Sequence, residues 1–166
     1  MFCIDQLNPN DILQIETLLD DCFGRNRHKK TAYRLRDDIP PLVELSFVVR
    51  IDGQVKASLQ FWPVLIRGAS SALDALLLGP IAVSRDCRGR GIGLKLMRHG
   101  LARARELGHK RVILVGDEAY YRKVGFCRNL ARDLHMPGPV ESERLLAREL
   151  VPGAMKNAIG LISRIK

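Results

Sequence analysis

The stretch "CRGRGIG" at residues 87–93 decides the fold, because it places two arginines and three glycines between an apolar run and a helix. The run before it, "LDALLLGPIAV" at residues 73–83, is long and apolar enough for a buried strand. The segment after it, at residues 94–108, has helical apolar spacing. Glycines let backbone N–H groups approach an anion, and a helix N-terminus adds unpaired donors and partial positive charge. The stretch therefore predicts a pyrophosphate site.

Positive charge is concentrated around this turn. The chain has 166 residues and a net charge of +9, and residues 88–111 hold eight basic residues against one acid. Residues 1–24 hold five acids and no base, whereas residues 25–38 hold six bases and two acids. An overall basic protein suggests a nucleic-acid partner. A local basic focus at a glycine turn instead favours a small polyanion.

The common nucleotide-binding loops do not fit this turn. A G-x-x-x-x-G-K-[ST] loop that starts at Gly89 needs glycine at position 94, which is Leu94, and a G-x-G-x-x-G fingerprint fails at the same position. The turn instead reads Arg-x-x-Gly-x-Gly, and its arginines can supply forked, charge-assisted bonds.

The other segments predict one mixed α/β domain over residues 1–166, with a central sheet and about four flanking helices. An Asp52–Gly53 turn predicts a hairpin between strands. Strands are expected at residues 2–7, 45–51, 54–64, 73–83, 111–116, 127–136 and 144–152. Helices are expected at residues 8–23, 25–39, 94–108 and 117–125. The third helix should pack through an apolar stripe of Leu94, Met97, Leu101, Ala104 and Leu107.

The cysteines and the hydropathy pattern set the expected compartment. The four cysteines, Cys3, Cys22, Cys87 and Cys127, lack zinc-site spacing, so no metal site is predicted and reduced thiols are expected. The start lacks a signal-peptide pattern, and the longest apolar run is too short for a membrane span. These features predict a cytoplasmic protein without membrane contact.

With these elements in this order, the sequence resembles the GNAT superfamily of acyl-CoA-dependent N-acyltransferases. The "RGRGIG" at residues 88–93 matches the family pattern R/Q-x-x-G-x-G/A, and "AYYRKVGF" at residues 119–126 matches its YY/FY-x-x-x-GF helix. The predicted strand at residues 111–116 lies between them, as the family requires. The segments "MPGPV" and "ELVPGA" resemble a bacterial subgroup whose acceptors are mostly unassigned.

The resemblance implies the fold and the cosubstrate. In this family the strand before the glycine turn and the strand after it splay apart, and the thioester of acetyl-CoA enters the gap. The resemblance implies that backbone groups of residues 81–83 contact the pantetheine arm and that residues 88–94 hold the pyrophosphate. The implied cofactor-binding residues are Ile81, Ala82, Val83, Arg88, Gly89, Arg90, Gly91, Ile92, Gly93 and Leu94.

Acyl transfer to an amine also needs a proton donor and a way to neutralise the amine. Tyr121 lies at the family's general-acid position, and a phenol with a pKa near ~10 can protonate a thiolate. Tyr120 is the alternative, although we expect it to be the buried tyrosine that packs the helix. No general base is evident from the sequence, and Asp74, Glu44 and Glu118 are the weak candidates.

Three function classes remain open from the sequence. The favoured one is an N-acetyltransferase that moves an acetyl group to an amine by direct attack in a ternary complex. The alternatives are an inactive acyl-CoA-binding regulatory module and a nucleic-acid-associated protein. The acceptor is expected to be a small-molecule or peptide amine, and the protein a monomer or homodimer. If the basic segment at residues 25–36 lines the acceptor mouth, an amine with a nearby carboxylate or phosphate should be preferred over a polycation.

Overall fold

The computed structural model describes residues 2–165, which form one mixed α/β domain built on an eight-stranded sheet. The strands are β1 (Cys3–Gln6), β2 (Ser46–Ile51), β3 (Gln54–Arg67), β4 (Ala72–Val83), β5 (Arg111–Val115), β6 (Leu134–His135), β7 (Leu145–Glu149) and β8 (Gly160–Ser163). The α-helices are α1 (Ile12–Phe23), α2 (Thr31–Arg34), α3 (Ile92–Glu106) and α4 (Glu118–Tyr121). The predicted fold class is confirmed.

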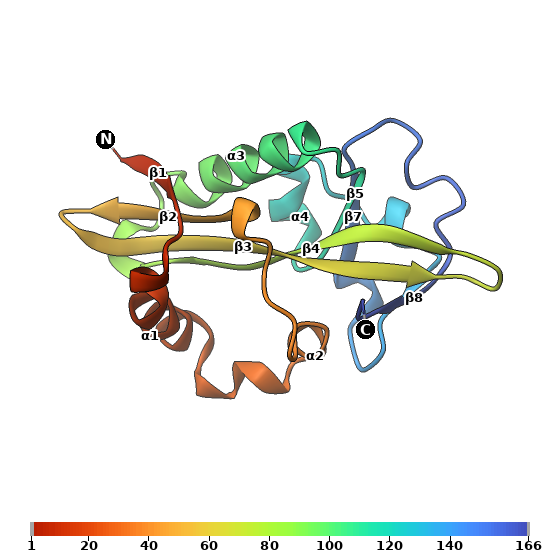
Figure 1. Ribbon diagram of the computed structural model, residues 1–166, viewed down its shortest axis with the longest axis horizontal. Coiled ribbons are helices and arrows are strands. Elements are labelled where there is room, and N and C mark those ends of the chain that lie inside the picture. The colour runs from red at the N-terminus through yellow and green to blue at the C-terminus, as the bar shows by residue number, and fades with distance from the viewer. Residues whose placement is uncertain (1, 166) are drawn as a thin grey trace.

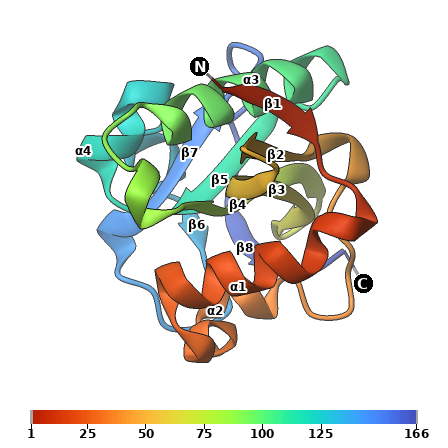
Figure 2. The same ribbon diagram turned by 90° about the vertical axis from the view of Figure 1, so that its left-hand side faces the viewer.

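The sheet separates the helices into two layers. Its main path runs β1-β2-β3-β4-β5-β7, with β8 beside β3 and β6 beside β8. Along the main path every pairing is antiparallel except that of β4 with β5. Figures 1 and 2 show α1 and α2 on one side of the sheet and α3 and α4 on the other. The cofactor turn and the basic segment therefore approach β4 from opposite sides.

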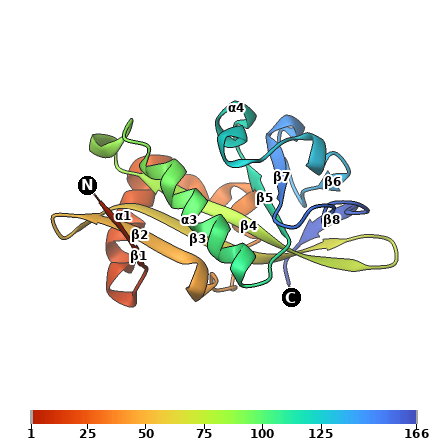
Figure 3. The ribbon, with the colours of Figure 1, turned by 90° about the horizontal axis from the view of Figure 1, so that it is seen from above.

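The sheet divides where β4 and β5 stop pairing. Only two residue pairs join these strands, Leu76 with Val112 and Leu77 with Ile113. Beyond Leu77, β4 continues with β3 alone while β5 continues with β7. Figure 3 shows the two strands diverging from this point. The last six residues of β4 therefore have one edge without a neighbouring strand, which is the splay that the family resemblance implies.

A bulge in β4 lies at the point of divergence. The register with β3 shifts between Leu59, which pairs with Ile81, and Phe61, which pairs with Leu78. Gly79 and Pro80 therefore lie opposite a single residue of β3. Proline lacks an N–H and suits such an interruption, and a bulge re-aims the chain around it.

The β2–β3 hairpin confirms the predicted turn. Asp52 and Gly53 have φ values of 52° and 78°, as a tight two-residue hairpin turn requires. Asparagine, aspartate and glycine tolerate this left-handed conformation best. The local sequence therefore determines this turn, and a bulge at Val49 and Arg50 then shifts the register of the two strands.

Helix α3 packs through a face that includes three of the five predicted residues, Met97, Leu101 and Ala104. Leu107 is 39% exposed, and Leu94 is only partly buried. The full buried face consists of Ile92, Gly93, Leu96, Met97, Gly100, Leu101 and Ala104. A Cβ on Gly100 would lie 2.7 Å from the Phe61 ring. Because α3 approaches β3 so closely at Gly100, the helix turns the face that contains Gly100 toward the sheet.

The predictions for the C-terminal third are partly wrong. Only Leu134 and His135 of the strand expected at residues 127–136 are in a strand. The Arg128 guanidinium donates to the carbonyls of Ala131 and Leu145, at 3.0 and 3.2 Å, and so holds a turn instead of an extended chain. Strand β8 was not predicted, because four residues after a glycine-containing loop carry little periodicity.

The basic segment is helical but broken. Instead of one helix over residues 25–39, it forms a 3₁₀ turn (Arg25–Lys29) and the single-turn helix α2. Within residues 2–165, no helix is long and apolar enough to cross a membrane.

Candidate active site

A hollow of about 520 Å³ runs along the free edge of β4 to the start of α3. Its walls include nine of the ten predicted cofactor-binding residues: Ile81, Ala82, Val83, Arg88, Gly89, Gly91, Ile92, Gly93 and Leu94. The tenth, Arg90, is exposed and does not line it. We call this space the cofactor hollow. It brings the strand edge and the glycine turn into one surface.

The N-terminus of α3 forms one end of the cofactor hollow. Gly91 has a φ of 73°, and a Cβ on it would meet no atom within 4 Å. The N–H of Lys95 is the first to bond back into the helix, to the Gly91 carbonyl at 3.1 Å. The N–H groups of the first turn lack intrahelical partners and present positive partial charge to the hollow.

The arginine of the turn is positioned by the β4 edge. Arg88 Nε donates to the Val83 carbonyl at 3.3 Å, and its Nη2 lies 3.7 Å from the Cys22 sulfur. Its guanidinium thus lies between the end of β4 and α1. Its remaining donors stay available to a ligand in the cofactor hollow.

A second, larger cavity of about 1100 Å³ opens on the α2 side of β4. It is lined by β4 around Gly79 and Pro80, by the end of β5, by α2 and by the loop at residues 139–141. Thr31 Oγ1 donates to the Pro139 carbonyl at 2.8 Å, which joins α2 to that loop. We call this space the acceptor cavity.

The two spaces meet at the divergence of β4 and β5. Phe23, Ile81, Tyr120 and Tyr121 line both of them. The shared wall means that a molecule along the β4 edge can be reached from the acceptor cavity. A bond between two substrates can form at this junction.

The two tyrosines differ in burial. We expected Tyr120 to be the buried one, but Tyr121 is. Tyr120 is 37% exposed, whereas Tyr121 packs against the main core and the Phe126 ring, 6.4 Å away between centroids. Burial raises the pKa of both phenols, and the neighbouring Tyr120 raises that of Tyr121 further. Tyr120 Oη lies 3.0 Å from where a Cβ on Gly93 would stand, so it faces the cofactor turn. Both phenols remain protonated at neutral pH.

The base candidates from the sequence lie outside the acceptor cavity. Asp74 lies by a separate hollow near Lys110, and Glu44 lines neither space. The Glu118 carboxylate accepts from the Arg128 N–H at 2.7 Å and pairs with Arg122 at 3.3 Å.

Two carboxylates that sequence reasoning missed do line the cavity. They are Asp117 and Glu141. The Asp117 side chain caps α4 by accepting from the Ala119 N–H at 3.3 Å, which leaves Glu141 as the less committed of the two. Glu141 follows a proline-rich loop, where its sequence gives no sign of the cavity it joins.

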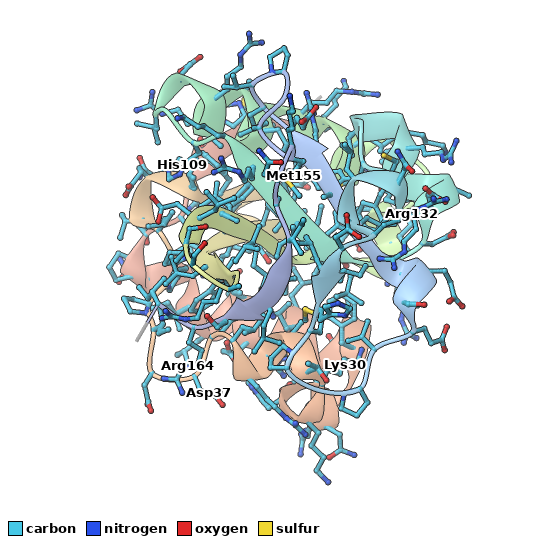
Figure 4. The ribbon with its side chains drawn as sticks, turned by 90° about the vertical axis from the view of Figure 1, so that its right-hand side faces the viewer. Lys30, Asp37, His109, Arg132, Met155 and Arg164 are labelled. Atoms are coloured by element: carbon cyan, nitrogen blue, oxygen red, sulfur yellow. The ribbon has the colours of Figure 1, made fainter. Side chains whose placement is uncertain are left out.

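The basic segment contributes unequally to the acceptor cavity. Of its six basic residues only Lys30 and Arg36 line the cavity, and Arg144 joins them from the far loop. Figure 4 shows Lys30 and Asp37 on the α2 side of the sheet, away from His109. The hypothesis that the whole segment lines the acceptor mouth is therefore wrong for the other four residues.

Cys87 is not placed as a nucleophile. Its side chain is buried in the main core, and burial raises the pKa of its thiol. A low thiol pKa and exposure are what a reactive cysteine needs.

Comparison with known proteins identifies the family. The model of the Acetyltransferase (GNAT) family matches residues 12–126. The chain is 30% identical over 155 residues to the uncharacterized N-acetyltransferase YhbS of Escherichia coli strain K12, covering 93% of this chain and 90% of that one.

Solved structures give the same result. The crystal structure of E. coli YhbS in complex with CoA matches with a TM-score of 0.83 and 28% identity, covering 98% of this chain and 89% of that one. A GNAT family acetyltransferase from Brucella melitensis in complex with acetyl-CoA matches with a TM-score of 0.63 and 30% identity, covering 89% and 95%. The predictions of an N-acetyltransferase and of acetyl-CoA as its cosubstrate are confirmed. The chain belongs to the Acetyltransferase (GNAT) family.

Proposed function

We propose that this N-acetyltransferase moves the acetyl group of acetyl-CoA directly to an amine while both substrates are bound. The observation that carries the proposal is the junction at Ile81 and the two tyrosines, where the cofactor hollow opens into the acceptor cavity. Two substrates that enter from opposite sides of the sheet can meet there without a covalent intermediate on the enzyme. Of the two thiols near the turn, Cys87 is buried in the main core, and Cys22 donates to the Val83 carbonyl at 3.5 Å.

The cosubstrate would be held chiefly by backbone groups. The free edge of β4 at residues 81–83 offers N–H and C=O groups to the amides of the pantetheine arm. The first turn of α3, with Arg88, would hold the pyrophosphate, since unpaired N–H groups and a guanidinium both favour negative charge. Glycine at positions 91 and 93 keeps side chains out of this path.

Tyr121 is our choice of general acid. Tyr121 lines both spaces, as Tyr120 does, but it alone packs against the main core and the Phe126 ring, which hold its phenol in place. A protonated phenol next to the leaving sulfur can donate to the thiolate as it departs. Tyr120 is more exposed and faces the cofactor turn, which suits a contact with the cosubstrate.

The amine must lose a proton before it attacks. An amine with a pKa of ~10.4 is neutral in about one molecule in 2,500 at pH 7, a penalty of roughly 4.6 kcal/mol. Glu141 is the cavity carboxylate that does not cap a helix, and it would accept this proton directly or through a water. Its replacement by glutamine should lower kcat/KM most at low pH.

The proposal is tested by CoA release. Wild-type protein and acetyl-CoA are mixed with a panel of amines that covers amino acids, peptide N-termini, lysine side chains, polyamines and aminoglycosides. Transfer to at least one amine supports the proposal. Tight acetyl-CoA binding without transfer to any amine would instead favour the inactive, CoA-binding regulatory module.

A further inference from the structure

Arg36 is a buried guanidinium without an acidic partner. The residue is 9% exposed, and its Nε and Nη1 have no hydrogen-bond partner among the described residues. It forms part of the wall of the acceptor cavity. Burial lowers the pKa of Arg36 to about 10, while the adjacent Tyr33 opposes that shift. At neutral pH the group remains charged.

Arg27, nine residues earlier, shows what a structural buried arginine looks like in this protein. It is 2% exposed, and its two Nη atoms pair with Asp20 and Glu16 of α1. That triad joins the 3₁₀ turn to the helix. Arg36 has no such carboxylates, so a structural ion pair does not explain it.

Two aromatic rings lie against Arg36 but give its N–H groups no acceptor. The guanidinium carbon lies 4.5 Å from the centre of the Tyr33 ring and 5.8 Å from that of Trp62. Such contacts hold the faces of a guanidinium and do not satisfy its N–H groups. The Tyr33 hydroxyl is also buried without a hydrogen-bond partner. A buried charge is costly unless an anion pairs with it.

The location of Arg36 limits where that anion can sit. Its Nη2 lies 3.2 Å from where a Cβ on Gly79 would stand, at the β4 bulge. Ile81, at the junction with the cofactor hollow, is only two residues further along β4. An anion on Arg36 would therefore be only a few bonds from an amine attacking at the junction.

We propose that Arg36 binds the carboxylate of the acceptor, and that the acceptor is a small amino carboxylate such as a free amino acid. This inference rests on the proposed function of the site. A planar carboxylate can accept two parallel bonds from one guanidinium. Lys30 and Arg144 add positive charge to the same cavity, which Asp117 and Glu141 also line.

The first test compares each free amino acid with its own carboxamide, at saturating acetyl-CoA. We expect the best amino acid to have a higher kcat/KM than its amide. The amide's amine is less basic and hence more often neutral, so this intrinsic bias works against the expected result. In Arg36→Met the ratio of kcat/KM for the amino acid to that for its amide should fall by about 10–100-fold, the usual range for a charge-assisted bond. Arg36→Lys should recover only part of it, because lysine lacks the fork.

Arg34→Met is the matched control. It removes the same charge from the same segment, but Arg34 is exposed and lies outside the acceptor cavity. In Arg34→Met the ratio of kcat/KM for the amino acid to that for its amide should stay at the wild-type value. An equal fall in both variants would show general steering by charge and overturn the proposal, as would a wild-type enzyme that prefers amides or spermidine.

A binding measurement separates this inference from the proposed function. N-acetylamino acids and their amides are titrated into the CoA-loaded protein and followed by ligand-observed NMR. We expect carboxylates to bind to the wild type, and to bind much more weakly to Arg36→Met. Equal binding to both proteins, or to neither, would overturn the role of Arg36 even if amines are acetylated. Carboxylate binding with no transfer to any amine would contradict the proposed function alone.

Discussion

The two spaces on either side of β4 are built from different parts of the chain. The cofactor hollow consists mostly of one continuous segment, residues 81–94, and its main groups are backbone N–H and C=O groups. The acceptor cavity is assembled from five separate parts of the chain, and its distinctive groups are side chains such as Arg36 and Glu141. A backbone site depends on glycines and tolerates other changes, whereas a side-chain site can change its ligand with one substitution. The same cofactor chemistry can therefore serve different acceptors.

The sharpest test of the backbone site is Gly91→Glu. It places a negative side chain where a pyrophosphate would lie, and like charges at such distances cost several kcal/mol. We expect the affinity for acetyl-CoA to fall by more than about 100-fold, as measured by calorimetry. Gly108→Glu is the matched control, because it has the same left-handed backbone and open surroundings at the other end of α3. If Gly91→Glu is folded and binds CoA like the control, the assignment of the cofactor hollow is wrong.

Tyr121→Phe tests the junction between the two spaces. It should lower kcat by about 10²–10⁴-fold, the usual scale for a general acid, with an unchanged Kd for acetyl-CoA. Tyr120→Phe should change kcat little, since its hydroxyl faces the cofactor turn. The reverse pattern would assign the proton donor to Tyr120.

The two buried arginines give a test on stability. In the double variant Glu16→Gln/Asp20→Asn, Arg27 would stay buried without its partners, at a cost of about 3–5 kcal/mol. Arg36→Met removes a charge that has no partner, so its free energy of unfolding should equal or exceed that of the wild type. Both values come from urea titrations followed by circular dichroism. A loss in Arg36→Met as large as that of the double variant would show that Arg36 is structural.

The smallest effect expected is on the pH profile. Because burial raises the pKa of Tyr121, the phenol keeps its proton beyond its usual range. With rising pH the amine deprotonates, so kcat/KM should increase. No decline in kcat/KM is expected until the pH reaches about 10. A decline that begins between pH 7 and 9 would contradict Tyr121 as the acid.

The contrast between the two spaces also explains what the sequence could predict. The turn at residues 88–93 and the hairpin at Asp52 are local, because glycine and aspartate require particular backbone conformations. For this reason, the residues that line the cofactor hollow could be predicted from the pattern of the turn. The place of Gly100 in the buried face of α3 was not predicted, because its fit against Phe61 depends on tertiary contact.

The acceptor cavity could not be read from the sequence for the same reason. Nothing in "RNRHKKTAYRLR" distinguishes Arg27, which pairs with α1, from Arg36, which does not. The difference arises only when α1 and β4 pack around the segment. Glu141 is likewise distant in sequence from α2, β4 and β5, which form other walls of the cavity. Strand β8 was too short to show a pattern.

The most direct test of the account is a crystal structure with CoA and an N-acetylamino acid, the pair of products. We predict the pyrophosphate at the first turn of α3 and the carboxylate within about 3 Å of the Arg36 guanidinium, a hydrogen-bonding distance. The acetyl group should lie beside Tyr121. A carboxylate that faces solvent while Arg36 stays unpaired would contradict the account of the acceptor cavity.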